Sequence, residues 1–401
     1  MKEREDYKAQ KKPYKFSISH TTLIMIITLG VLVLWLCFML ILRTNAKICE
    51  WVCDTFVNAY TNVAGRIYSL VDFNVFEVLA TLFVIAVIAV LVAAIVLFAK
   101  GKKVLSRQLM IGILIGVAWI SNLYIFTAGF AYNREKAPIP VYESEIDADL
   151  AKDTYIALIN DFNDCVNTLG VYPDGRAVCP YTEKELRQKV EDAYKRLVTD
   201  EYYYDFTAKG KPVISSGIMA SFSISGITFT PTVEGGYNKD MPAYQKVCTI
   251  AHELAHTKGV MREDEANALA AFVLLNSGDA YLRYSFYVDS IWESRTFIMY
   301  RSDFMDIYKK NPISKAYSSE VEYSSKWWDE HNFMQKIGNF FNDLYLKFNG
   351  EDEGSNSYYE PPKEEDSGEK DEEGKPIYIV VNYNTMQKIM VNYYVNNLKF
   401  K

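Results

Sequence analysis

The stretch His252-Glu253-Leu254-Ala255-His256 decides the fold and chemistry that this sequence predicts, because it places two histidines four residues apart. On a helix, residues four apart lie on one face, so both imidazoles can bind the same ion. Glu253 lies beside them, where a carboxylate can take a proton from water on that ion. The preceding residues 247–251 are mostly apolar, which indicates a core helix whose polar side chains need partners. The pattern predicts a metal site.

Two histidines leave a catalytic zinc ion one protein ligand short, because such sites usually have three protein ligands and a water molecule. On a straight helix Glu263 would lie about 10 Å beyond His256 along the axis, too far for a zinc–oxygen bond of about 2 Å. The chain must therefore turn back. Gly259 can adopt the left-handed conformation that ends a helix. A second helix starting near Arg262 would then bring an acidic side chain to the ion.

The acidic residues at the start of that second helix, Glu263, Asp264 and Glu265, compete for the role of third ligand. We expect Glu263, because Asn267 lies four residues later on the same face and can support its carboxylate. Glu265 is the alternative ligand. The three carboxylates could also be no more than an acidic first turn that the helix dipole stabilises.

A site with two histidines, one glutamate and one open position suits zinc best. The sequence thus predicts a zinc metallopeptidase, in which zinc acidifies a water molecule and Glu253 acts as the general base. Segment 227–230 is expected to form an edge strand that an extended peptide substrate could join. The residues expected to contact the oxyanion or the substrate are Arg283, Tyr284, Tyr287 and His331. Their spacing in the sequence does not decide which of them does so.

A non-proteolytic zinc-binding sensor or scaffold of the cell envelope is the alternative function. Such a structural site would normally close the fourth position of the ion with another protein side chain. Glu253 is the only such group nearby in the sequence, which favours an open catalytic site. The two hypotheses differ in whether Glu253 is needed for peptide cleavage.

The composition limits the partners of the chain. Its formal net charge is −7, and no stripe rich in Lys and Arg lies outside the flanks of the apolar segments, which argues against nucleic acid. Three stretches of the first third carry no formal charge, at about 21–42, 78–99 and 108–133. Each is long enough to cross a bilayer as a helix, which needs about 20 residues. We therefore expect a lipid bilayer as a partner, beside a peptide or protein substrate.

The basic residues predict the orientation. The segment before the first apolar stretch and the short loop at 100–107 are rich in Lys and Arg, so both are expected in the cytoplasm. Three crossings of the cytoplasmic membrane then place the chain after about residue 134 on the outer side. Between the first two stretches, apolar residues recur at spacings of three and four, which favours a helix along the membrane surface: Ile48, Trp51, Val52, Phe56, Tyr60, Val63 and Ile67.

These residues carry two resemblances. The pair His252 and His256, followed by Glu263-x-x-x-Asn267, resembles the gluzincin metallopeptidases, whose third ligand is a glutamate on a later helix. Gly259 occupies the glycine position of the metzincin pattern, but Arg262 stands in place of the third histidine of that pattern, so a metzincin is excluded.

Over most of its length the chain also resembles an uncharacterised bacterial membrane family, the domain of unknown function thirty-eight-ten. The similarity includes the exit from the third apolar stretch, Gly129-Phe130-Ala131-Tyr132-Asn133-Arg134. It continues through the segments 211–216, 224–238, 252–267, 283–285 and 342–347. The resemblance implies a membrane-anchored, zinc-peptidase-like protein with three N-terminal membrane-spanning helices.

We expect a mainly α protein of the α+β class. Residues 1–137 are predicted to form a membrane domain with three transmembrane helices, and residues 138–350 a mostly helical zincin-like domain. Alternating and β-branched residues between 211 and 232 predict a small sheet. Residues 351–376 are rich in Glu, Asp, Lys, Gly, Ser and Pro, which is typical of an acidic disordered insertion. A strand and a helix within 377–401 are expected to dock back on the zincin-like domain.

Overall fold

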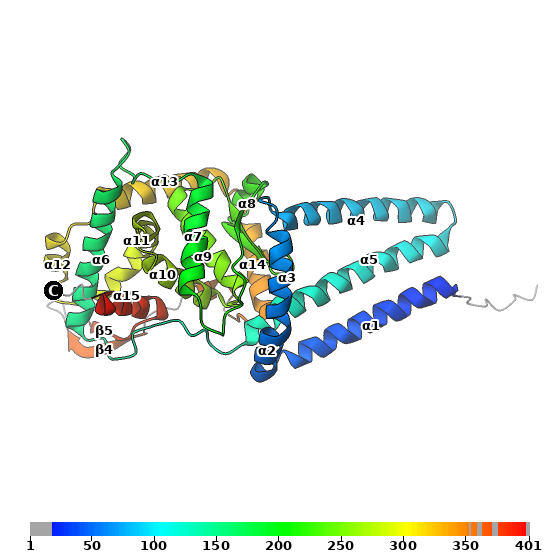
Figure 1. Cartoon of the computed structure of the whole chain (residues 1–401), viewed down its shortest axis with the longest axis horizontal. Helices are drawn as coiled ribbons and strands as arrows, with labels where there is room; N and C mark the ends of the chain where they lie inside the picture. The colour runs from blue at the N-terminus through cyan, green and yellow to red at the C-terminus, as the bar shows by residue number, and fades with distance from the viewer. Residues whose placement is uncertain (1–17, 353, 359–362, 371–375, 398–401) are drawn as a thin grey trace, which may run out of the picture. The chain divides into compact units, whose positions relative to one another are not determined.

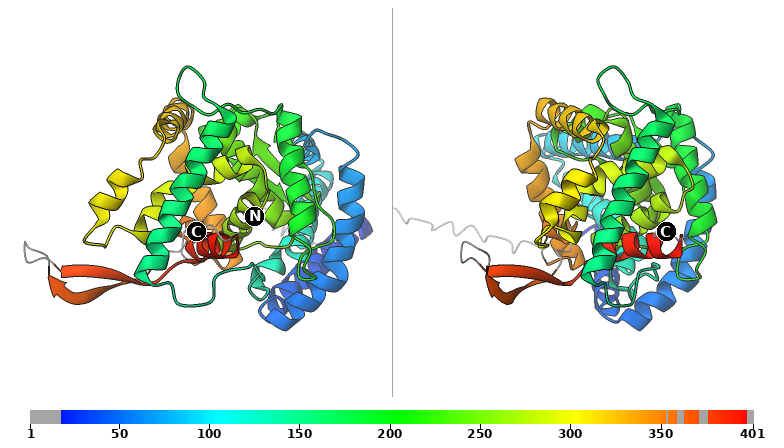
Figure 2. Two further views of the ribbon diagram at one scale, coloured as in Figure 1. Left: turned by 60° about the vertical axis from the view of Figure 1, so that its left-hand side comes forward. Right: turned by 90° about the vertical axis from the view of Figure 1, so that its left-hand side faces the viewer.

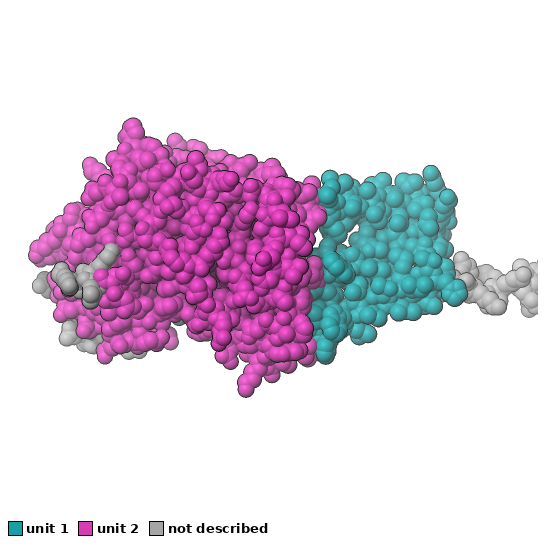
Figure 3. All heavy atoms as spheres, in the orientation of Figure 1, with its two compact units in different colours: residues 1–39, 82–122 teal, residues 40–81, 123–401 magenta. Residues whose placement is uncertain are grey.

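The computed structural model describes residues 18–352, 354–358, 363–370 and 376–397 (Figure 1). The chain forms two compact units (Figure 3). The first contains Met1–Met39 and Leu82–Asn122, and the second contains Leu40–Thr81 and Leu123–Lys401. The described part of the chain is mainly α with a small sheet, as the sequence predicts.

Three long apolar helices confirm the stretches that the sequence marks as membrane-spanning. They are α1 (His20–Leu42), α4 (Val75–Ala99) and α5 (Lys103–Tyr124), with mean hydropathy values of 2.9, 3.4 and 2.1 over their most apolar windows. After α5 the helix continues through a π-helical turn, η2 (Ile125–Gly129), and a 3-10 turn, η3 (Ala131–Asn133). Most of their large apolar side chains are exposed in the protein alone, as expected for helices that a bilayer covers. Their orientation stays a prediction from charge.

Two helices of the second unit, α6 and α7, begin with side-chain caps. The Asp147 carboxylate accepts hydrogen bonds from the first backbone N–H groups of α6, and Thr182 with Glu185 forms a capping box on α7. Helix α9 packs against α7, α10 and α11. The helices are α6 (Ala148–Leu169), α7 (Glu183–Leu197), α8 (Ser216–Ser221), α9 (Ala243–Thr257), α10 (Glu263–Leu275), α11 (Ala280–Ser294), α12 (Phe304–Lys310), α13 (Lys315–His331), α14 (Gln335–Asn349) and α15 (Thr385–Asn396), with a 3-10 turn η4 (Arg295–Phe297).

A three-stranded sheet lies against α9. Its strands are β1 (Gly210–Val213), β2 (Gly226–Phe229) and β3 (Glu234–Asn238), in the order β1-β3-β2. The central strand β3 pairs in parallel with β1 and antiparallel with β2, so β2 is an edge strand, as predicted. Glycines allow close approach to the helix, because a Cβ atom at Gly235 would lie 3.1 Å from the Cβ atom of Glu253.

Between α1 and α4 the chain forms one interrupted helix, consisting of α2 (Ala46–Val52), a π-helical turn η1 (Cys53–Val57) and α3 (Asn58–Tyr68). The longer π turn keeps Trp51 and Phe56 on one side, where their rings meet at 5.2 Å between centroids. Both rings are exposed, as are Val63 and Ile67 farther along. The amphipathic helix that the sequence predicts is therefore present with an exposed apolar face, but Val52 of the predicted face is buried and Tyr60 is half-buried.

Residues 351–376 contain more regular structure than the sequence predicts. A 3-10 turn, η5 (Gly354–Tyr358), is followed by strand β4 (Lys363–Lys370), which pairs antiparallel with β5 (Pro376–Asn382). Figure 2 shows this hairpin projecting from the helical body. The strand β5 and the helix α15 match the predicted C-terminal strand and helix. The composition of β4 does not indicate a strand. It forms one because the strongly β-forming β5 supplies backbone hydrogen bonds to it.

The turn between α9 and α10 gives a test of the fold. Gly259 has φ +88°, and a Cβ atom there would lie 2.8 Å from the Tyr204 ring. Gly278 also has a left-handed φ of +72°, but nothing lies within 4 Å of its Cβ position. We expect Gly278→Ala to lower the free energy of unfolding by about 1–2 kcal/mol through backbone strain alone. Gly259→Ala should cost about 1–3 kcal/mol more through overpacking, as measured by unfolding in detergent. Equal losses would contradict this account.

Candidate metal centre

The centre is built on one face of α9. Residues 251–257 of this helix are largely buried between the sheet and the neighbouring helices, and His252 and His256 lie one turn apart with ring centroids separated by 4.6 Å. The helix ends at Thr257, and the left-handed Gly259 reverses the chain. Helix α10 then starts at Glu263, as the sequence predicts. Its first residue therefore returns to the imidazoles.

The three predicted ligand side chains meet at one point. The Glu263 Oε2 atom lies 3.1 Å from His252 Nε2 and 3.5 Å from His256 Nε2. One ligand atom from each of these residues lies within 4.8 Å of the other two. The group includes neither Asp264 nor Glu265. These distances are compatible with a single small cation between the side chains.

Hydrogen bonds fix which nitrogen of each imidazole faces this point. His252 Nδ1 lies 2.8 Å from the amide oxygen of Asn267, and His256 Nδ1 lies 2.8 Å from the carbonyl oxygen of Val260. Both oxygens can only accept, so each Nδ1 carries a proton and each Nε2 faces the Glu263 carboxylate. Among the described residues no hydrogen-bond donor reaches the buried Glu263 Oε2. Three acceptor atoms thus converge where only a cation or a proton can join them.

The electrostatics agree with this geometry. Burial lowers the pKa of His256, but the Glu263 carboxylate beside it outweighs burial and raises the pKa to about 9. Burial raises the pKa of Glu263, but the two histidines outweigh it and lower the pKa to about 2. Without an ion, the pair holds a proton at the same point. A metal ion would replace that proton.

Glu253 lies beside the cluster in a place of its own. The Thr228 hydroxyl of edge strand β2 lies 2.7 Å from Glu253 Oε2 and donates to it. Gly226 of the same strand leaves room for the other carboxylate oxygen, because a Cβ atom there would approach Oε1 to 2.3 Å. Burial raises the pKa of Glu253. The carboxylate is therefore fixed in position and is a better proton acceptor than an exposed one.

Two details of the predicted site differ in the structure. Asn267 was expected to support Glu263, but its amide oxygen contacts His252 instead and its Nδ2 donates to the carbonyl oxygen of Tyr358. Asn267 lies on the same face of α10 as Glu263. Because α10 packs against α9, this face also brings Asn267 beside His252 of α9. Glu265, the alternative ligand, is held by Arg262 at 2.6 Å and accepts the Ala137 N–H.

The expected oxyanion and substrate residues make contacts elsewhere. The Arg283 guanidinium contacts Asp161 and Tyr393, and the Tyr287 hydroxyl donates to Asp161. Tyr284 donates a hydrogen bond to Glu320, and His331 stacks on Trp327 of its own helix α13. The contacts of Arg283, Tyr284 and Tyr287 thus join α11 to α6, α13 and α15. A role for them at the cluster stays an unsupported prediction.

A tyrosine outside the predicted set is electrostatically coupled to the site. The hydroxyl of Tyr345 on α14 contacts the hydroxyls of Tyr124 and Tyr132, both at 3.1 Å. Burial raises the pKa of Tyr345, and the nearby carboxylates of Glu263 and Glu253 raise it further. The Tyr124 hydroxyl also contacts Asn349 Oδ1 at 3.0 Å, so the three tyrosine hydroxyls and Asn349 form one hydrogen-bonded group. The sequence analysis noted the block 342–347 but gave Tyr345 no role.

Comparison with known proteins gives one match. The family model described as "Protein of unknown function (DUF3810)" matches residues 53–362. This range includes His252, Glu253, His256, Glu263 and Tyr345. No curated protein and no solved structure matches the chain. The matched range covers more than half of the chain and confirms the predicted family resemblance. The chain therefore belongs to the DUF3810 family of proteins of unknown function.

Proposed function

We propose that this protein is a membrane-anchored zinc metallopeptidase that hydrolyses peptide bonds. His252, His256 and Glu263 would hold one zinc ion, and Glu253 would act as general base. The observation that carries the proposal is the position of Glu263 Oε2, a buried carboxylate oxygen without a hydrogen-bond donor between two imidazole Nε2 atoms. We further propose that the second unit lies outside the cytoplasmic membrane, which the basic residues around the apolar helices support.

The donor set suits a catalytic zinc ion. Two neutral imidazoles and one carboxylate leave one coordination position for water or substrate. A bound zinc ion would supply a Lewis acid that acidifies water and polarises a carbonyl group. Asn267 and Val260 already hold both imidazoles in the orientation and tautomer for binding, so the chain needs little rearrangement to take up the ion.

The other residues of the site support peptide hydrolysis. Glu253, steadied by Thr228, is placed to take the proton of the attacking water and pass it to the leaving amine. Edge strand β2 runs beside Glu253 and can pair with an extended peptide through its backbone. The Tyr345 hydroxyl can donate to the oxyanion that forms on the attacked carbonyl group.

One observation favours the second candidate, a non-proteolytic zinc-binding scaffold. The cluster is enclosed, because the side chains of His252, His256 and Glu263 are only 15%, 8% and 4% exposed. Tyr358 of η5 lies over it, with its ring centroid 6.2 Å from that of His252. As a peptidase the protein must therefore move η5 to admit a substrate.

Metal binding tests the ligand set. We expect the full-length protein to hold one zinc ion per chain, and Glu263→Gln to weaken zinc binding at least about 100-fold because it removes a ligand rather than a supporting group. The matched control is Glu265→Gln, which changes the neighbouring buried carboxylate and should leave zinc binding intact. Elemental analysis and zinc titration of the metal-free protein measure both. Equal affinity in the wild-type and Glu263→Gln proteins would rule out this ligand set.

The role of Glu253 separates the two candidate functions. We expect Glu253→Gln to retain zinc and to lose about 10²–10⁴-fold in cleavage rate, because the amide cannot accept the proton. Mass spectrometry of membranes with the wild-type or variant protein measures new peptide termini. Retained zinc with an unchanged set of termini would support the scaffold instead.

Tyr345→Phe tests the oxyanion donor with a peptide cleaved by the wild-type protein. We expect kcat to fall about 10²–10³-fold with little change in KM, because the hydroxyl acts on the oxyanion and not on the bound substrate. Tyr124→Phe is the control, since it removes a hydrogen bond to Tyr345 but keeps the Tyr345 O–H. A similar fall in both variants would show that the hydroxyl only supports packing.

A further inference from the structure

We infer that the site acts at the membrane surface, on a polypeptide segment within about ten residues of its own bilayer anchor. This inference rests on the proposed peptidase function and adds the substrate class, the membrane-proximal segment of a membrane-anchored protein. It stands on contacts within the second unit, which holds both the candidate site and the ends of the apolar helices.

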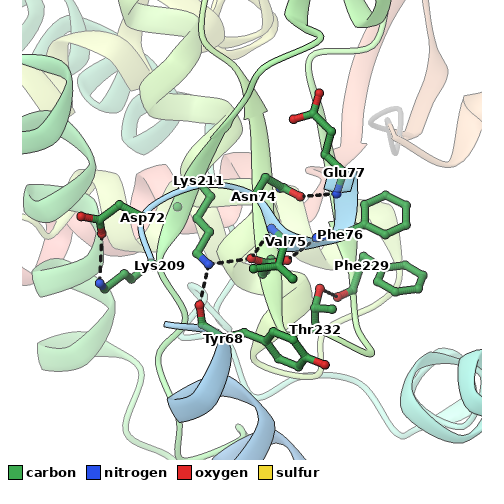
Figure 4. Close-up of polar contacts among 12 residues, drawn as sticks. Tyr68, Asp72, Asn74, Val75, Phe76, Glu77, Lys209, Lys211, Phe229 and Thr232 are labelled. Carbon is green, nitrogen blue, oxygen red and sulfur yellow. Dashed lines mark hydrogen bonds and ion pairs between the residues drawn. The ribbon is translucent and has the colours of Figure 1, made fainter. Parts of the chain in front are cut away.

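The sheet beside the site holds the first turn of α4. The Glu234 carboxylate, at the start of β3, accepts the backbone N–H groups of Val75 and Phe76 at 3.0 and 2.9 Å (Figure 4). Lys211 of β1 contacts the same carboxylate at 2.6 Å and donates to the carbonyl oxygen of Tyr68 at 2.7 Å. The side chains of Lys211 and Glu234 are each only 1% exposed. This buried pair fixes the start of the apolar helix to the sheet.

The bilayer boundary lies directly after this turn. The Glu77 carboxylate accepts the backbone N–H groups of Ile214 and Ser215, both at 2.7 Å, so it stays with the folded body outside the hydrocarbon. Residues 78–99 carry no charge, and at about 1.5 Å each they span about 33 Å. The hydrocarbon core is about 30 Å thick, so nearly all of this stretch is needed to cross it. The boundary therefore lies close to residue 78.

A short path links this boundary to the proposed general base. The ring of Phe76 stacks on that of Phe229 with 4.0 Å between centroids (Figure 4). The residue before Phe229 is Thr228, whose hydroxyl contacts the Glu253 carboxylate at 2.7 Å. The path from the first turn of α4 to that carboxylate is on the order of 15 Å. An extended chain advances about 3.3 Å per residue, so about five residues cover the distance directly and about ten allow for a bend.

The ends of the other two apolar helices contact the same part of the second unit. Arg43, which follows the last residue of α1, donates to the carbonyl oxygen of Phe348 at 3.0 Å. Tyr124, the last residue of α5, donates to Asn349 at 3.0 Å. Both contacts fix the C-terminal end of α14, the helix that carries Tyr345. The ends of α1 and α5 thus contact the helix that carries Tyr345, and the start of α4 contacts the sheet beside the site.

Helix α14 also presents an apolar face that a bilayer surface would cover. Five large apolar side chains recur at spacings of three and four and are 46–64% exposed: Ile337, Phe340, Phe341, Leu344 and Phe348. An exposed apolar stripe of this kind marks an interaction surface. Because the C-terminal end of α14 is tied to the ends of α1 and α5, lipid is the occupant that we assign to the stripe.

Anchored peptides test the substrate class with the full-length protein in vesicles of phosphatidylethanolamine and phosphatidylglycerol. A random peptide library is attached to a palmitoyl chain through a short spacer or through about 20 prolines, a rigid spacer of about 60 Å. We expect the short-spacer library to be cleaved at least about tenfold faster, because only it holds peptides at the height of Glu253. Glu253→Gln is the control for both. Equal or faster cleavage on the long spacer overturns the inference but keeps the peptidase, whereas no cleavage dependent on Glu253 overturns both.

A depth measurement tests the geometry without relying on cleavage. A fluorophore is attached at Phe341→Cys on α14, in a protein whose exposed Cys37 is replaced by Ser. The control label is at Met305→Cys, which is 52% exposed on α12, at the other end of the second unit from α3 (Figures 1 and 2). We expect nitroxide lipids to quench the label on α14 and to leave that on α12 unchanged. Equal quenching at both positions, or none at α14, overturns the inference.

Discussion

The structure depends on one constraint, the return of an acidic side chain to two imidazoles that lie on the preceding helix. Gly259 makes this possible by reversing the chain with a left-handed backbone, and the result places Glu263 Oε2 within 3.5 Å of both Nε2 atoms. A buried carboxylate without a partner costs several kcal/mol, and the proton that Glu263 shares with the imidazoles offsets this cost. The packing of α9, α10 and β2 around this point then positions Glu253 and Thr228.

Much of the site follows from local sequence. The helix that bears His252 and His256, the turn at Gly259 and the start of α10 at Glu263 depend on spacing within a few residues, and each was predicted. The partner of Asn267 was not predicted correctly, because helical spacing gives its direction but not which residue of the packed helix it meets. Tyr345 was missed because only the tertiary packing of α14 brings its hydroxyl to that of Tyr132, 213 positions earlier in the chain.

In the fold, too, the elements with a local sequence signal were predicted, and those that depend on contacts between distant residues were not. The apolar helices and the edge strand β2 carry their own signals in length and alternation. Strand β4 does not, because its residues are acidic and its order comes from pairing with β5. The contacts of Glu234 and Glu77 with α4 also join distant parts of the chain, and no motif indicates them. Such contacts place the catalytic chemistry that we propose beside the start of the apolar helix α4.

The coordination of a bound ion tests the central claim most directly. X-ray absorption at the zinc edge of the full-length protein reports the type and distance of the donor atoms. This account predicts two imidazole nitrogens and carboxylate oxygen at about 2.0–2.2 Å, with the imidazole signal reduced in His252→Ala. Sulfur donors at about 2.3 Å, or a shell of oxygen atoms without imidazole, would contradict it.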